Sequence, residues 1–96
     1  MKETNIKLLH NIIKLRYGNE EESEKYGQIQ WRNDGVYIFI IKGIRKQTEI
    51  NTIFHELLHY GSDELGINLT HEQIYVLAFF FTEVYYKIIK KGVLEK

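Results

Sequence analysis

Two histidines and a glutamate in the middle of the chain have the residue types and spacing of a metal site. His55 and His59 lie four positions apart with Glu56 between them, in the pattern HExxH. On an α-helix, residues four apart lie one above the other about one turn away. Both imidazoles can therefore bind one tetrahedral ion, for which zinc fits best. Glu56 lies one residue on, where it can reach a metal-bound water as a general base without ligating the metal.

Two histidines leave such a site incomplete, because catalytic zinc sites usually carry three protein ligands and one water. The nearby candidates for the third ligand are Asp63, Glu64, His71 and Glu72. A second helix that folds back after a short turn would enclose the ion from another direction than the first helix. We therefore favour Glu72, whose carboxylate also suits the first turn of a helix. Asp63, Glu64 and His71 stay open as alternatives.

The helix that must carry the motif is predicted over Thr48–Leu65, with its first residue as N-cap and Gly66 at its end. Apolar residues before and inside HExxH recur there at helical spacing. A second helix is predicted over His71–Lys90. Thr70 and Gln73 fit a capping box at its start. The pattern favours a helical hairpin with the histidine pair on its first arm.

The chain before the motif is predicted to contain one helix and one β-hairpin. Apolar residues recur at helical spacing over Thr4–Tyr17, and Gly18 follows as a helix-ending residue. The acidic run at 19–24 indicates a solvated loop. Alternation over Gln28–Trp31 predicts a half-buried strand, followed by a turn at Asn33–Gly35.

The residues after that turn, Val36–Ile41, predict a strand that is buried on both faces. The whole chain, residues 1–96, is then one minimal zincin-like domain of class α+β. It consists of an N-terminal helix, a small antiparallel β-hairpin, the HExxH helix and a C-terminal helix. If the strand Val36–Ile41 has a free edge, it could receive a peptide substrate as an added strand.

Charge and cysteine content exclude several classes of function. Lys plus Arg equals Asp plus Glu at 13 each, which argues against a nucleic-acid or anionic-membrane surface. The chain has no cysteine, so disulfides, a cysteine nucleophile and cysteine-ligated zinc are excluded. The longest uncharged apolar run, Ile74–Phe81, is too short to cross a bilayer, and the first ten residues lack the apolar core of a signal peptide. We expect a cytoplasmic protein.

The order of these elements and several motifs resemble the ImmA/IrrE-like metallopeptidases, especially the short versions of phages and prophages. The resemblance implies a zinc-dependent peptidase that hydrolyses peptide bonds of a protein substrate. It implies His55 and His59 as zinc ligands, Glu56 as the base, and an acidic third ligand from the following helix, for which Glu72 fits best. The residues that carry it are Tyr26–Ile29, Trp31, Tyr37–Ile41, Thr52–His59, Glu64–Ile67 and Glu72–Ala78.

The last predicted helix suggests a second class of function. Its run Ile74–Phe81 is apolar on every side, and such a helix must be buried on every side. A homodimer or a partner protein could cover what a small core cannot. The alternative to an enzyme is therefore a non-catalytic protein-binding module on a zinc-stabilised scaffold, such as a phage inhibitor of a host system. An open metal position favours the enzyme, and a fourth protein ligand favours the binding module.

A peptidase also needs a hydrogen-bond donor for the oxyanion that forms during peptide hydrolysis. Three residues close to the motif carry suitable groups, namely Tyr60, His71 and Tyr75. The sequence does not choose among them.

Overall fold

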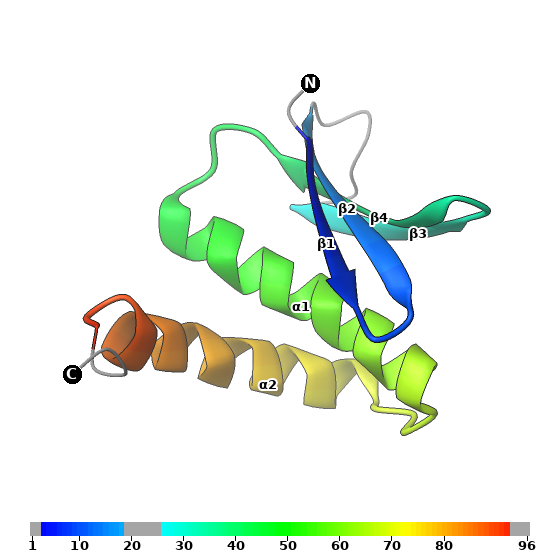
Figure 1. Ribbon diagram of the computed structural model, residues 1–96. Coiled ribbons are helices and arrows are strands. Elements are labelled where there is room, and N and C mark those ends of the chain that lie inside the picture. The colour runs from blue at the N-terminus through cyan, green and yellow to red at the C-terminus, as the bar shows by residue number, and fades with distance from the viewer. Residues whose placement is uncertain (1–2, 19–25, 93–96) are drawn as a thin grey trace.

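The computed structural model describes residues 3–18 and 26–92, so the predicted loop at 19–24 lies outside the described part. Three layers build the molecule, with one helix between a sheet and a second helix (Figure 1). The class is α+β, as predicted. The elements are β1 (Glu3–Leu8), β2 (Asn11–Gly18), β3 (Gly27–Arg32), β4 (Gly35–Ile41), α1 (Lys46–Leu65), α2 (His71–Val84) and the π-helical turn η2 (Tyr85–Ile89).

The sheet has the strand order β1-β2-β4-β3. The inner pair, β2 and β4, is parallel, and both outer pairs are antiparallel. The prediction of a strand buried on both faces is confirmed, because every residue from Val36 to Ile40 is at most 4% exposed. The same strand is paired on both sides, so it has no free edge for a substrate. Among the strands of the described residues, the outer edges of the sheet belong to β1 and β3.

The predicted N-terminal helix over Thr4–Tyr17 is wrong, because this segment forms the β1–β2 hairpin. Within β2, Ile13, Leu15 and Tyr17 pack on the core cluster, and the residues between them point to the other face. The segment therefore fits a period of two as well as a helical period. Its isoleucines favour the strand, since β-branched side chains suit a pleated surface.

The turn of this hairpin contains none of the residue types that usually mark a two-residue turn. It is made by Leu9 and His10, and Leu9 has φ 55°, a left-handed conformation that leucine rarely adopts. Two-residue hairpin turns are usually marked by Gly, Asn or Asp. Gly18, expected to end a helix, is instead the last residue of β2, and its carbonyl accepts a hydrogen bond from Lys42 N–H at 3.0 Å.

Long cationic side chains cover the sheet face opposite α1. Tyr37 and Phe39 of β4 point to this face and stack at 6.0 Å between ring centroids. The charged groups of Lys14, Arg16 and Arg32 lie 5.2, 4.6 and 4.3 Å from the Tyr37 ring centroid. Such cations attract the aromatic face while their stems cover apolar surface. Strand β4 is therefore buried on both faces, although a helix covers only one face of the sheet.

The start of α1 differs from the prediction by two residues. The helix begins at Lys46 after the N-cap Arg45, which makes no side-chain capping bond. The predicted N-cap Thr48 lies inside the helix, and its carbonyl accepts a hydrogen bond from Thr52 Oγ1 at 2.7 Å. The predicted end is confirmed, because Gly66 adopts φ 67° and closes the helix.

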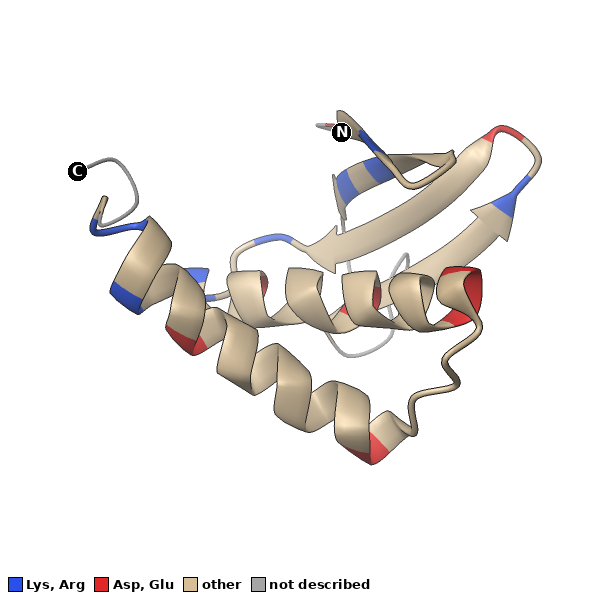
Figure 2. Cartoon of the chain, turned by 60° about the horizontal axis from the view of Figure 1, so that its bottom comes forward, with Lys and Arg blue, Asp and Glu red and all other residues tan. Residues whose placement is uncertain are grey.

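The predicted capping box of α2 is confirmed. Gln73 N–H donates to Thr70 Oγ1 at 3.1 Å, and Thr70 N–H donates to Gln73 Oε1 at 2.9 Å. The regular α-helix ends at Val84, and the π-helical turn continues to Ile89. No charged residue lies between Glu72 and Glu83 on α2 (Figure 2). In the described segments, no helix has the length and hydropathy needed to span a bilayer.

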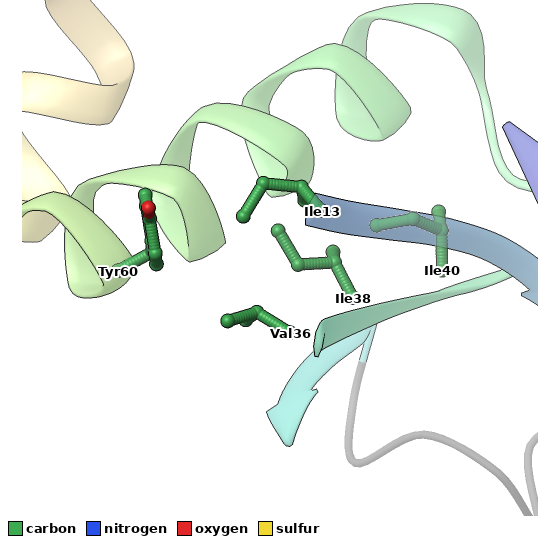
Figure 3. Packing of buried hydrophobic residues seen from close by; sticks show 5 residues of the cluster. All are labelled: Ile13, Val36, Ile38, Ile40 and Tyr60. Carbon is green, nitrogen blue, oxygen red and sulfur yellow. The ribbon is translucent and has the colours of Figure 1, made fainter. Parts of the chain in front are cut away.

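The core lies between the sheet and α1 (Figure 3). Its buried members are Ile13, Val36, Ile38, Ile40 and Tyr60, none more than 2% exposed. The Tyr60 hydroxyl donates a hydrogen bond to the Leu8 carbonyl at 2.7 Å and accepts one from Asn11 Nδ2 at 3.1 Å. Tyr60 therefore fastens the helix that carries the histidines to the N-terminal hairpin.

Candidate metal centre

The two histidines of HExxH lie side by side on α1. Their Nε2 atoms are 3.2 Å apart. Two nitrogens bound to one tetrahedral zinc ion at about 2.05 Å each would be about 3.3 Å apart. The spacing between His55 and His59 therefore fits a shared ion.

The third member of the cluster is His71, the first residue of α2. The short connection from Gly66 to Thr70 folds α2 back along α1, which brings its first turn beside the motif. The ring centroid of His71 lies 5.4 Å from that of His55 and 5.2 Å from that of His59. One nitrogen from each ring lies within 4.8 Å of the other two. Three imidazoles are a ligand set that zinc uses in catalytic sites.

Glu72, which the sequence favoured as third ligand, is not part of this cluster. It is exposed and lines a separate pocket with Leu69, Gln73 and Val76. Successive helical side chains differ in direction by about 100°, so Glu72 cannot share the direction of His71. Asp63 and Glu64 are also outside the cluster. Of the four candidates, the structure brings only His71 to the histidine pair.

Glu56 lies beside the cluster and faces the interior. It is 8% exposed, and its carboxylate has no hydrogen-bond or ion-pair partner within the described residues. Burial raises the pKa of the Glu56 carboxyl to about 7. With His55 and His71 it lines a pocket of about 260 Å³. A carboxyl group with a pKa near neutrality can both accept and return a proton at physiological pH.

The strand β3 closes this pocket at Gly27, where it approaches α1. A Cβ atom on Gly27 would lie 2.5 Å from Thr52 Cγ2 and 3.1 Å from the Phe39 carbonyl oxygen. It would also lie 3.6 Å from Glu56 Oε2. A glycine is therefore needed for the observed distance between the strand and the helix.

The electrostatic surroundings of His59 favour its neutral form. Burial lowers the pKa of His59, and the charge of His71 lowers it further, against the opposing effect of Asp63. A neutral imidazole is the form that binds a metal ion. The half-buried position of His59 thus prepares it as a ligand.

The candidates for an oxyanion donor are placed very differently. Tyr60 is in the core, and its hydroxyl is used in the hydrogen bonds to the hairpin. His71 belongs to the metal cluster. Tyr75 is 66% exposed and lines the pocket of Glu56. Of these three residues, only Tyr75 combines access to the pocket with a hydroxyl that has no hydrogen bond among the described residues; Tyr26, which the sequence analysis did not name, lines the same pocket and has such a hydroxyl too.

Comparison of the chain with protein-family models, with curated proteins and with solved structures gave no match. The resemblance to ImmA/IrrE-like peptidases of phages and prophages therefore stays a prediction. Function is inferred from the histidine cluster, Glu56 and the pocket that they line.

Proposed function

We propose that the protein is a zinc-dependent metallopeptidase in which His55, His59 and His71 hold the metal and Glu56 transfers the proton. The observation that carries this proposal is the convergence of three imidazole nitrogens within 4.8 Å beside a buried carboxylate. Glu72 of the sequence prediction is replaced by its neighbour His71.

Glu56 has the position for general acid–base catalysis. A zinc ion at the three histidines would supply a Lewis acid and lower the pKa of water toward neutrality. Glu56 would accept a proton from the attacking water and pass it to the leaving amine nitrogen. Tyr75 would donate a hydrogen bond to the developing oxyanion.

The outer edge of β3 supports a polypeptide as the substrate. β3 is an edge strand, and its first residue, Gly27, lines the same pocket as Glu56 and His71. An extended peptide paired to this edge would lie against the pocket through main-chain hydrogen bonds. Main-chain hydrogen bonds do not depend on the side chains of the peptide, so recognition of a particular protein would depend on other surfaces.

The number of ligands favours catalysis over a structural metal. The cluster has three members within the described residues, whereas structural zinc sites are closed by four protein ligands. His55 and His71 of the cluster also line the pocket of Glu56, where a water molecule or a substrate would have access. We also propose a cytoplasmic location, because the chain has no cysteine with which to use an oxidising compartment.

Metal content tests the ligand assignment. Purified wild type should bind one zinc ion per chain, and His71→Ala should lower the affinity at least about tenfold because one of three ligands is lost. The matched control is Glu72→Ala, one residue away, which should keep the wild-type affinity. Loss of zinc from Glu72→Ala with retention by His71→Ala would reverse the assignment. No zinc in wild type after loading would remove the metal site altogether.

Peptide cleavage tests the role of Glu56. Zinc-loaded wild type should cleave members of a quenched-fluorescent peptide library, and a chelator should stop the reaction. Glu56→Gln should keep the zinc and lose activity by about 10²–10⁴-fold, the usual contribution of a general base. Equal cleavage by wild type and Glu56→Gln at equal zinc content would contradict the proposal.

A further inference from the structure

The outward face of α2 is apolar and has no partner within the described chain. Tyr75, Val76, Phe79 and Phe80 are 66, 59, 61 and 57% exposed. They lie three or four residues apart and so share one side of the helix. The opposite side, with Ile74, Ala78 and Thr82, is the buried side. An aromatic surface of this kind marks an interaction site.

We name these four residues, Tyr75, Val76, Phe79 and Phe80, the α2 surface. They expose on the order of 500 Å², given the 150–250 Å² that one aromatic side chain can bury. A stable interface buries about 800 Å² per partner. The α2 surface alone supplies more than half of that area.

Charged residues border the α2 surface at both ends. Glu72 lies seven residues before Phe79, and Lys87 lies seven residues after Phe80. Both are exposed. Figure 2 shows the acidic start of α2, then an uncharged stretch that ends at Glu83, and basic residues beyond it. Glu83, which is also exposed, lies between Phe80 and Lys87.

We propose that a second copy of this chain covers the α2 surface, with the two α2 helices antiparallel about a two-fold axis between Phe79 and Phe80. Glu72 and Lys87 lie the same number of residues from this axis, so the pairing brings Glu72 of each copy near Lys87 of the other. Phe79 of each copy packs against Phe80 of the second copy. A two-fold interface is self-complementary, and this arrangement of charges is self-complementary.

The charge pattern selects this pairing over the others. A parallel pairing would place Glu72 beside Glu72 and Lys87 beside Lys87, which costs free energy at both ends. An unrelated partner would need the reverse charges at the same spacing, whereas a second copy already has them. Tyr75 lies at the border between the α2 surface and the Glu56 pocket. The second copy would therefore stand next to the candidate metal centre.

The mass of the full chain in solution tests the pairing. Sedimentation equilibrium at about 1–200 µM should give twice the 11.5 kDa of the chain. Phe80→Ser should weaken association by about 100-fold, because aromatic residues at interface centres dominate binding. The control is Ile6→Ser, an exposed apolar residue of β1, which should keep the wild-type mass. A monomer at every concentration, or an undiminished dimer in Phe80→Ser, would overturn the proposal.

Charge exchange tests the register without changing the apolar residues. Glu72→Lys and Lys87→Glu should each weaken the dimer by about tenfold, since each creates two like-charge contacts across the axis. The double variant restores both pairs and should return the affinity to within about threefold of wild type. A double variant as weak as the single variants would exclude the antiparallel register. The measurements are made both with zinc and with chelator, so that failure of the metal site does not affect the conclusion.

Discussion

At the scale of single residues, the sequence predicted that the histidine pair and its glutamate lie together, and the structure places His55 and Glu56 on one pocket with His59 beside His55. The third member of the histidine cluster could not be chosen from the sequence, because Glu72 and His71 are adjacent and almost equally close to the motif in the chain. Their side chains differ in direction by about 100°. Which one faces the histidine pair depends on the rotation of α2 about its own axis, which packing against α1 decides. Phe54 and Phe81 contribute to that packing, with ring centroids 5.9 Å apart.

Gly27 gives a prediction at the residue scale. Gly27→Ala should lower the free energy of unfolding by about 1–3 kcal/mol, the usual cost of an added methyl group in a packed site. The added Cβ would lie 2.5 Å from Thr52 Cγ2. Urea denaturation gives the free energy of unfolding.

A second substitution separates this contact from other effects of the alanine. Thr52→Ser removes Cγ2 but keeps the hydroxyl that donates to the Thr48 carbonyl. Gly27→Ala combined with Thr52→Ser should therefore recover part of the loss. Only part is expected, because the Phe39 carbonyl stays 3.1 Å from the new Cβ. If the double variant is no more stable than Gly27→Ala alone, the contact with Thr52 Cγ2 is not the cause of the lost stability.

At the scale of elements, the segments with local chemical signals were predicted well. The capping box of α2, Gly66 and the strand of β4 all have signals within a few residues. The β1–β2 hairpin has none, because its turn uses Leu9 in a conformation that the residue type does not indicate. Its strands also satisfy a helical period. β2 forms a strand because it pairs with β4, which lies more than twenty residues further along the chain.

The contact between β2 and α1 gives a prediction about pH. Tyr17 at the end of β2 donates a hydrogen bond to Glu49 Oε2 on α1 at 2.9 Å. Burial raises the pKa of Tyr17 to about 12, and the hydrogen bond to Glu49 adds to the rise. The pKa of Tyr17 is thus higher in the folded state than in the unfolded state, where it is near 10. The contribution of Tyr17 to the free energy of unfolding is therefore fully present below pH 10 and is lost as the pH rises toward 12.

Tyr17→Phe cannot ionise at this position and should lose less stability between pH 9 and pH 12 than wild type does. Chemical denaturation at a series of pH values measures the difference. Glu49→Gln should keep most of the wild-type loss, because burial is the larger cause of the shift. Identical pH profiles of wild type and Tyr17→Phe would show that the contact does not contribute.

At the scale of the whole molecule, the predicted class α+β is confirmed, while the layering was not contained in the sequence pattern. α1 is covered by the sheet on one side and by α2 on the other. α2 is the outermost layer, so only one of its sides is buried. The prediction that a helix apolar on all sides needs more cover than a 96-residue chain supplies agrees with the exposure of Phe79 and Phe80.

The parallel pairing of β2 with β4 also has a consequence for the order of folding. The β3–β4 hairpin and the α1–α2 pair join segments that are neighbours in the chain, so their contacts form at little entropic cost. β2 meets β4 only after a loop that contains β3 has closed, with Lys14 opposite Tyr37. The entropy of closing that loop must be overcome before Ile13 enters the core. We therefore expect the docking of the N-terminal hairpin to be the slowest step in the folding of this protein.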